Sequence, residues 1–306
     1  MSKDIIIGGA SNYSWDQLKY WVNSIVKSGF TGDVVLVATN ISKETIDELT
    51  QRGVKLALYG NKEKDGGFKA HSNGAPHTER FFYMWNTLCE LNPRDYRYVI
   101  TTDTRDVIFQ TNPSDWLEKN LSNRKIVCSS EGLKYKDEPW GNKNLLETFG
   151  PYFHNILKEN LIYNVGTIGG DFSYIKDLLL MIFQMSVNRP IPIVDQAVFN
   201  FLINQYPYCD DKIIHKTTNF SGYPRGWAIQ LGTTEQAILA GHGDIGQIVS
   251  NDPTQLVLYK LAYQDEQPTI REDGVVADPN NKPFTIVHQY DRIPELKKKI
   301  EALYAN

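Results

Sequence analysis

Residues 97–109 read RYVITTDTRDVIF and decide the architecture of this chain. The apolar run at 98–100 predicts a buried central strand, and Asp103 and Asp106 follow where that strand leaves its sheet. In open α/β sheets, ligands bind at the carboxyl ends of the strands. Two carboxylates at such a position offer hard oxygen ligands to a divalent cation. The alternative interpretation is that Asp103 caps a turn and Asp106 pairs with Arg105.

Strands and helices alternate before this stretch. Apolar runs predict strands at 5–7, 34–38 and 54–59, and periodic patterns predict helices at 15–27, 42–51 and 76–90. Ser42 is the expected N-cap of the second helix. The alternation predicts an α/β protein with a mostly parallel sheet and right-handed crossovers. The polar loop 60–75 contains four glycines, and we expect it to be mobile and to close on a ligand.

The second half of the chain is less regular. It predicts strands at 125–129, 161–168 and 284–288, and helices at 172–187, 195–206 and 294–303. Residues 217–247 hold six glycines, and we expect a long functional loop there. Residues 1–306 are expected to form a single domain, with one half at 1–110 and the other at 111–306.

Composition narrows the class of protein. The 306 residues carry a net charge of −4 and are 41% hydrophobic, which argues against nucleic acid as a partner because a phosphate backbone calls for a basic face. The three cysteines are widely spaced and form no CxxC motif, so a zinc site or a disulfide framework is not expected. No apolar run is long enough for a membrane span, and the first residues do not match a signal peptide. A cytoplasmic location is therefore the expectation.

Three further positions are candidates for ligand binding. The turn at Gly8 and Gly9 follows the first strand without a GxGxxG fingerprint, so it either lets a base or ribose approach the backbone or makes a tight connection. Arg80 lies beside the predicted central strand, where its guanidinium suits a diphosphate, although a solvated surface arginine fits the spacing equally. His288 ends a predicted strand and is either a third ligand for a Mn²⁺-like ion or an ordinary satisfied side chain.

Four segments together resemble GT-A glycosyltransferases of the glycogenin-like and galactosyltransferase-like families. TTDTRDVIFQTNP (101–113) resembles their metal-binding DxD strand end, with Arg105 at the second carboxylate position and Asp106 one residue later. YNVGTIGG (163–170) is similar to their Asn-small-Gly strand, and VDQAVFNFLI (194–203) resembles their DQ helix start. IVHQYDR (286–292) is similar to their late metal-binding histidine segment. The four segments stand in the family order and span most of the chain.

The resemblance implies a GT-A-like Rossmann-type fold, mixed and mostly parallel, and transfer of a sugar from a nucleotide-diphosphate donor to a glycan or glycoconjugate acceptor. Residues 1–110 would be the nucleotide-binding half, and 111–306 the acceptor-side half. Mn²⁺ or Mg²⁺ would be held by Asp103, Asp106 and His288. The implied donor-binding residues are Gly8, Gly9, Tyr13, Arg80, Thr102, Asp103, Asn164, Gly169 and Gly170. Tyr223 and Trp227 either stack on an acceptor sugar or pack in the core.

Asp195 and Gln196 are the implied catalytic pair. Glycogenin-like enzymes retain the anomeric configuration, and the resemblance favours retention here, whereas an inverting enzyme would need Asp195 as a general base. The alternative is that Asp195 only caps a helix. Two other functions remain open. A sugar nucleotidyltransferase would want a basic glycine-rich phosphate loop after the first strand, and a non-catalytic carbohydrate-binding module would not hydrolyse a nucleotide sugar.

Overall fold

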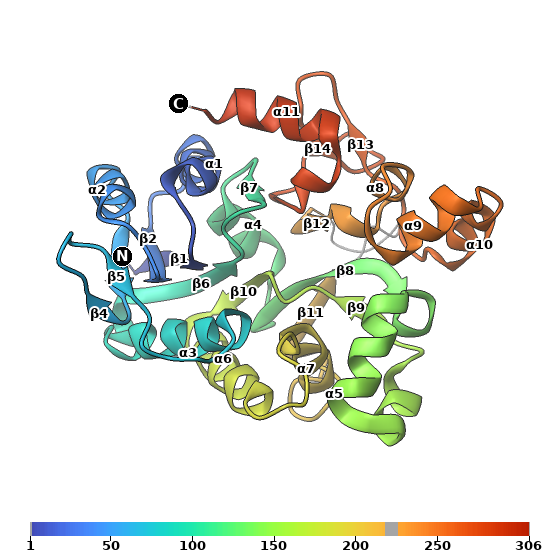
Figure 1. The fold of residues 1–306 in the computed structure, drawn as a ribbon, viewed down its shortest axis with the longest axis horizontal. Helices are drawn as coiled ribbons and strands as arrows, with labels where there is room; N and C mark the ends of the chain where they lie inside the picture. The colour runs from blue at the N-terminus through green and yellow to red at the C-terminus, as the bar shows by residue number, and fades with distance from the viewer. Residues whose placement is uncertain (1, 218–225, 306) are drawn as a thin grey trace.

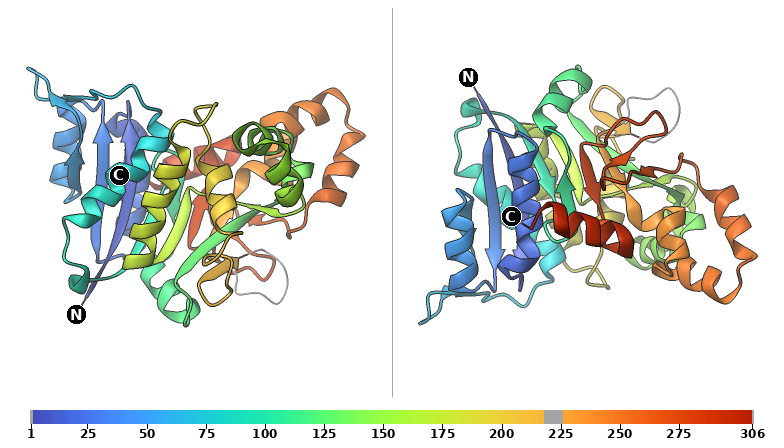
Figure 2. Two further views of the ribbon diagram at one scale, coloured as in Figure 1. Left: turned by 90° about the horizontal axis from the view of Figure 1, so that it is seen from below. Right: turned by 90° about the horizontal axis from the view of Figure 1, so that it is seen from above.

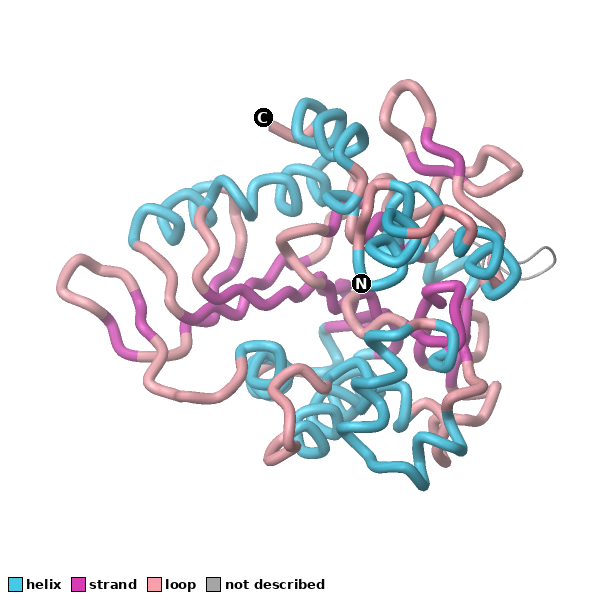
Figure 3. The backbone as a smooth tube through the Cα atoms, turned by 45° about the vertical axis from the view of Figure 1, so that its right-hand side comes forward, coloured by secondary structure: helices cyan, strands magenta, loops and turns pink. Residues whose placement is uncertain are grey.

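A computed structural model describes residues 2–217 and 226–305 of the chain. A mixed sheet of eight strands forms its centre, and Figure 3 shows helices on both faces of this sheet. The strand order is β11-β8-β10-β6-β1-β2-β3, and β9 pairs with β8 beside this path. The strands are β1 (Lys3–Ser11), β2 (Asp33–Thr39), β3 (Lys55–Leu58), β6 (Tyr96–Thr102), β8 (Ile126–Lys134), β9 (Leu161–Tyr163), β10 (Thr167–Asp171) and β11 (Ile214–Thr217).

The alternating side chains of the strands build two cores. Ile5 and Ile7 face one core, and Ile6 between them faces the other, as the two-residue period of a strand requires. The first core packs against α3 (Pro76–Cys89), α6 (Phe172–Ser186) and α7 (Asp195–Leu202). The second packs against α1 (Trp15–Lys27), α2 (Lys43–Gln51) and α4 (Pro113–Asn120). Figure 1 shows α3 and α6 on one side of the sheet and α1 on the other.

The first 110 residues largely follow the sequence prediction. Helix α1 has the predicted bounds, and the Ser42 hydroxyl caps α2 by accepting a hydrogen bond from the backbone N–H of Thr45 at 3.2 Å. β6, β1, β2 and β3 are mutually parallel. The strand order reverses at β1, because β2 and β3 lie on one side of it and β6 lies on the other, and such a switch point opens a crevice at the carboxyl ends of β1 and β6. Within the predicted loop 60–75, the short strands β4 (Asn61–Lys62) and β5 (Phe68–Lys69) form a hairpin.

The second half departs from the prediction in several places, and the long helix α5 (Pro139–Leu157) was not predicted at all. The predicted strand 161–168 is in fact two strands, β9 and β10, separated at Asn164–Gly166, where the backbone N–H of Gly166 donates to the Asn164 side chain at 2.7 Å. Such a local side-chain bond favours a turn over an extended strand. β10 then runs antiparallel to both β6 and β8.

The predicted functional loop at 217–247 is wrong for its described part. That part contains β12 (Ala228–Gln230), α8 (Glu235–Leu239) and the start of α9 (Gly243–Asn251). Trp227 is fully buried, and its indole N–H donates to the carbonyl of Thr167 at 3.1 Å. The expectation that Trp227 stacks on a sugar is therefore wrong, and core packing is correct. Tyr223 lies outside the described residues.

The C-terminal part joins the main sheet through a second, smaller sheet. This sheet has the order β12-β15-β7, with β7 (Val107–Phe109) directly after the central strand and β15 (Ile286–His288). The last helix, α11 (Pro294–Leu303), has the predicted bounds and lies near α1 (Figure 2), where the Asn23 amide donates to the Tyr304 carbonyl at 2.9 Å. The remaining elements are α5 (Pro139–Leu157), α10 (Gln255–Ala262), β13 (Thr269–Ile270) and β14 (Val276–Ala277).

Candidate metal and donor site

The smaller sheet brings His288 to the two aspartates. β15 pairs antiparallel with β7, so that His288 lies opposite Val107, and the backbone N–H of Gln289 donates to the Asp106 carbonyl at 2.7 Å. His288 Nε2 consequently lies 3.4 Å from Asp103 Oδ2 and 3.6 Å from Asp106 Oδ1. One ligand atom from each of Asp103, Asp106 and His288 falls within 4.8 Å of the others. Residues 185 positions apart in the sequence (288 − 103) thus form one cluster.

The donor set fits a divalent cation. Two carboxylates and one imidazole are the ligands that Mn²⁺-like ions accept. His288 Nδ1 lies 2.7 Å from Gln230 Oε1, and the Gln230 amide donates in turn to Thr167 Oγ1 at 2.7 Å. These two hydrogen bonds hold the imidazole with Nε2 toward the carboxylates, as hydrogen bonds to the second ring nitrogen do for metal-binding histidines. A Cβ atom on Gly166 would lie 2.7 Å from Asp103 Oδ2 and 2.9 Å from His288 Cε1, so the glycine keeps this space open.

Charges around the cluster shift its pKa values. Burial raises the pKa of Asp103, but the Arg80 guanidinium and His288 outweigh burial and hold it well below its usual range. Burial likewise raises the pKa of Asp106, and His288 reverses the direction to a net lowering. Burial lowers the pKa of His288, yet Asp106 and Asp103 raise it to about 9. Both carboxylates are therefore ionised, and the imidazole is protonated, at neutral pH in the metal-free protein.

Arg80 connects the cluster to α7. Its guanidinium forms ion pairs with Asp103 and, at 2.9 Å, with Asp195, and only 15% of its side chain is exposed. The solvated-surface interpretation of Arg80 is therefore wrong. Asp195 is the first residue of α7, and Val194 holds the N-cap position, so the N-cap interpretation of Asp195 is wrong too. The Asp106–Arg105 pair of the alternative interpretation is present, at 3.7 Å, while Arg292 approaches Asp106 more closely, at 3.3 Å.

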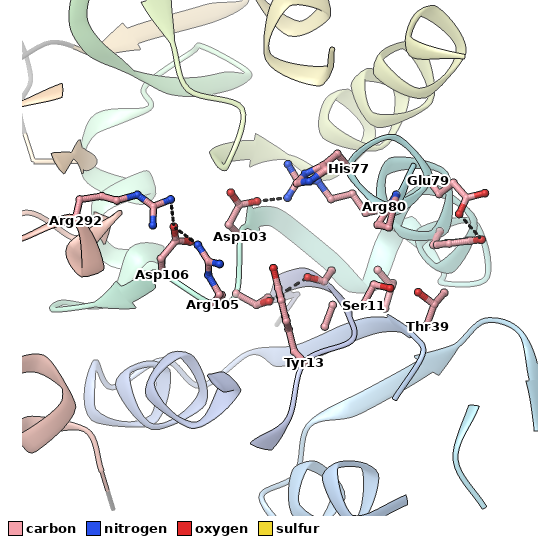
Figure 4. A pocket seen from close by; sticks show the side chains of 16 residues that line it. Ser11, Tyr13, Thr39, His77, Glu79, Arg80, Asp103, Arg105, Asp106 and Arg292 are labelled. Atoms are coloured by element: carbon pink, nitrogen blue, oxygen red, sulfur yellow. Dashed lines mark hydrogen bonds and ion pairs between the residues drawn. The ribbon is translucent and has the colours of Figure 1, made fainter. Parts of the chain in front are cut away.

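Two cavities meet at this cluster. The first, of about 360 Å³, lies over the ends of β1 and β2 and is lined by Gly9, Ser11, Tyr13 and Thr39 (Figure 4). The second, of about 410 Å³, lies on the side of α5, α7 and α9. Both cavities are lined in part by His77, Arg80, Asp103, Asp106 and Arg292. Figure 4 shows Asp103, Arg105, Asp106 and Arg292 gathered at one end of the first cavity.

The second cavity contains the predicted residues Asn164, Asp195 and Gln196. It also contains Glu131, a buried carboxyl group within β8 that sequence reasoning missed. The Asn164 amide donates to Glu131 Oε1 at 2.7 Å, and Gln196 also forms a side-chain hydrogen bond with Glu131. Burial raises the pKa of Glu131, against the opposing effect of the bond from Asn164. Glu131 therefore positions the two amide side chains of this cavity.

Four of the residues predicted to bind the donor line neither cavity, as far as the described residues show. These are Gly8, Thr102, Gly169 and Gly170. Each instead has a packing role. A Cβ atom on Gly8 would lie 2.3 Å from Thr104 Cγ2, and one on Gly169 would lie 2.5 Å from the Trp227 ring. Gly170 has φ +155° and faces the Lys125 carbonyl, while the Thr102 hydroxyl accepts the Trp21 indole N–H at 2.9 Å.

Gln230 and Arg292 were also missed. Gln230 lies in the region predicted as a loop, and nothing in its local sequence pairs it with His288. Arg292 stands four residues after His288 in the quoted IVHQYDR segment, which was the available signal.

Comparison with protein-family models and with curated protein sequences finds no match. Among solved structures, the galactosyltransferase LgtC in complex with donor and acceptor sugar analogs superposes with a TM-score of 0.52 over 97% of this chain and 95% of its own, at 11% identity. Mouse xyloside xylosyltransferase 1 gives a TM-score of 0.50 at 12% identity, covering 93% and 97%. The chain has a GT-A-type glycosyltransferase fold. The predicted fold class is therefore confirmed.

The bifunctional glycosyltransferase WbbM gives a TM-score of 0.53 at 12% identity, over 97% of this chain. The chain spans about half of WbbM, 52% of its length. Within residues 2–217 and 226–305, none of the helices has both the length and the apolar character needed to cross a bilayer.

Proposed function

We propose that this chain is a metal-dependent glycosyltransferase that moves a sugar from a nucleotide-diphosphate donor to a carbohydrate acceptor. The observation that carries the proposal is the position of the Asp103, Asp106 and His288 cluster where two separate cavities meet. A sugar-transfer enzyme needs two substrates that meet at one point, and open α/β sheets bind ligands over the carboxyl ends of their strands, where the first cavity lies.

The first cavity suits the nucleotide. Ser11 and Thr39 offer hydroxyl groups at the ends of β1 and β2, and Tyr13 offers an aromatic ring. A diphosphate beside Asp103 and Asp106 would be repelled, by about 4 kcal/mol per pair of unit charges at 4 Å in a surface-like dielectric. A bound Mn²⁺ or Mg²⁺ reverses that sign and stabilises the negative charge of the leaving diphosphate as a Lewis acid.

Two arginines can support the same phosphates. The Nε atoms of Arg80 and Arg292 are buried and lack a hydrogen-bond partner among the described residues. Guanidinium groups bind phosphate oxygens with directed N–H donors. In the second cavity, Asp195 and Gln196 would lie on the sugar and acceptor side. The ion pair with Arg80 occupies one oxygen of Asp195, which favours a positioning role over that of a general base and agrees with retention.

The test is turnover of a panel of nucleotide sugars with Mn²⁺ and with EDTA, together with calorimetric titration of UDP and GDP. We expect Mn²⁺-dependent hydrolysis or transfer with at least one donor, and loss of metal-dependent nucleotide binding in Asp103→Asn and Asp106→Asn. Asp115→Asn changes an exposed aspartate of α4 and is the matched control. Unchanged nucleotide affinity in both site variants would refute the metal assignment. Metal-dependent binding without any turnover would instead indicate the non-catalytic module.

A sugar nucleotidyltransferase is less well supported, because no basic residue stands between the end of β1 and the start of α1, where residues 8–15 read GGASNYSW. Release of pyrophosphate from a nucleoside triphosphate and a sugar phosphate would identify that activity.

A further inference from the structure

A third cavity, of about 200 Å³, adjoins the second cavity. Trp140 and Ile193 line both of them. Trp140 stands near the start of α5 with 44% of its surface exposed, and Ile193 precedes α7 with 39% exposed. Large apolar side chains this exposed, side by side on a concave surface, indicate a binding site.

The side chains that line the third cavity suit an amphipathic ligand. Beyond Trp140 the third cavity is lined by Pro192 and by the polar groups of Lys143, Asn144 and Glu147. Lys143 and Glu147 are a weak ion pair, 3.9 Å apart on the exposed face of α5, so their charges compensate. A sugar ring has an apolar C–H face and a rim of hydroxyl groups, which match a flat indole flanked by hydrogen-bonding side chains. A neutral surface of this kind favours an uncharged sugar over a phosphate or an acidic peptide.

The indole is available for such contact because the fold does not use it. Glu138 caps α5 by accepting from the backbone N–H groups of Trp140 and Gly141, so the cap needs the Trp140 backbone and not its side chain. Trp227, in contrast, is fully buried.

We infer that the acceptor is an oligosaccharide of at least two sugar units, with the reacting unit in the second cavity and the next ring stacked on Trp140 toward the third. This inference rests on the proposed function and adds to it the length of the acceptor and a residue that selects for it. Because Trp140 and Ile193 belong to the walls of both cavities, they give the direction in which the acceptor would leave the site.

The experiment compares methyl glycosides of galactose, glucose and xylose with lactose, cellobiose and xylobiose. Each saccharide is titrated by saturation-transfer NMR onto the protein loaded with UDP and Mg²⁺, which is diamagnetic and leaves the saccharide signals sharp. On the unmodified protein, at least one disaccharide should bind about tenfold more tightly than the matching monosaccharide, as expected for one added aromatic contact. In Trp140→Ala this advantage should fall to about unity, and Trp140→Phe should restore part of it.

Tyr152→Ala is the matched control, because Tyr152 is an exposed aromatic residue of the same helix, 71% exposed, and lines neither cavity. It should keep the disaccharide advantage. An advantage that persists in Trp140→Ala, or no advantage on the unmodified protein, would overturn the inference. Nucleotide-sugar hydrolysis, measured without any saccharide, reports on the proposed function separately, so that each claim can fail alone.

Discussion

His288 shows how a single residue depends on its neighbours for its protonation state. Its pKa lies at about 9 because Asp106 and Asp103 outweigh the effect of burial, and Gln230 holds the other ring nitrogen. An imidazole binds a metal ion only after it loses the proton from the binding nitrogen. Metal and proton therefore compete for Nε2.

This competition predicts that Mn²⁺ affinity rises with pH. The His288 imidazole is protonated below about pH 9 in the metal-free protein. The apparent affinity for Mn²⁺ should therefore rise by up to about tenfold per pH unit and level off near pH 9. Calorimetric titration at pH 6.5, 7.5 and 8.5, in two buffers of different ionisation enthalpy, measures both the slope and the release of about one proton per ion. His288→Gln should bind more weakly and lose the slope, and a slope kept in that variant would contradict the role given to His288.

Asp195 allows a second prediction for a single residue. Asp195→Asn replaces the charge that holds Arg80 at 2.9 Å, so turnover should fall about a hundredfold, the size of a lost acid–base or positioning group. Affinity for the donor and for metal should survive, because Asp195 is not a proposed metal ligand. Steady-state rates with a saturating donor and calorimetric donor binding separate the two effects. Near-normal turnover would leave the catalytic group of the chain unidentified.

At the scale of the element, the start of α5 joins a helix cap to the acceptor side. Glu138 accepts two backbone N–H groups there, and burial raises its pKa to about 7 despite the bond from Gly141. A carboxyl group whose folded pKa lies above its unfolded value of 4.5 stabilises the fold fully below pH 4.5. That stability is lost as the pH rises from 4.5 to about 7.

Glu138→Gln should remove this dependence while keeping an oxygen acceptor for the cap. The difference in free energy of unfolding between pH 4.5 and pH 8 should shrink by about 2 kcal/mol relative to the unmodified chain, after allowance for partial exposure. Urea unfolding at the two pH values measures it. Glu147→Gln, a change at an exposed position of the same helix, should not alter the difference in free energy of unfolding between the two pH values. An equal effect of both variants would contradict the role of Glu138 in the pH dependence.

The helices and strands also show how much of the secondary structure could be predicted from the sequence. α1 and α11 were predicted with their observed bounds, because a long amphipathic period and a proline or lysine at the ends are local signals. β12 and α8 were missed, because each has at most five residues and stands among glycines. At the break between β9 and β10, the Asn164 side chain accepts a bond from the backbone of Gly166 and also donates to Glu131, 33 residues away. A local sequence pattern carries no information on the second contact.

At the scale of the whole molecule, the candidate site is assembled from both halves of the chain. Asp103 and Asp106 could be assigned from a strand end, and a family resemblance assigned His288. Gln230 and Glu131 could not be assigned, because strand pairing places Gln230 beside His288 and a contact with Asn164 places Glu131 at the site. The sequence also could not separate Gly9, which lines the first cavity, from Gly8, Gly169 and Gly170, which lie outside the described cavity walls. A glycine that lets a ligand approach and a glycine that makes room for Trp227 look alike in a sequence.

A ligand bound at the candidate site should stabilise the folded molecule as a whole. At a hundredfold excess over its dissociation constant, UDP with Mn²⁺ adds about 2.7 kcal/mol, which corresponds to a rise in melting temperature of roughly 5 °C for a chain of this size. Differential scanning fluorimetry measures the rise, and EDTA should cancel it. A rise with UDP that EDTA leaves intact would show that the nucleotide binds without the ion.

The pairing of β7 with β15 has a consequence for the chain during its synthesis. A growing polypeptide folds from its N-terminal side, and the parallel strands β1, β2, β3 and β6 are complete once residue 102 has been made. Asp103 and Asp106 follow at once, yet their imidazole partner arrives only with residue 288. Until then, nothing from β15 covers β7, and two acidic groups stand without their histidine. Nascent or prematurely terminated chains that stop before residue 288 should therefore be catalytically silent, even where the nucleotide side has already folded.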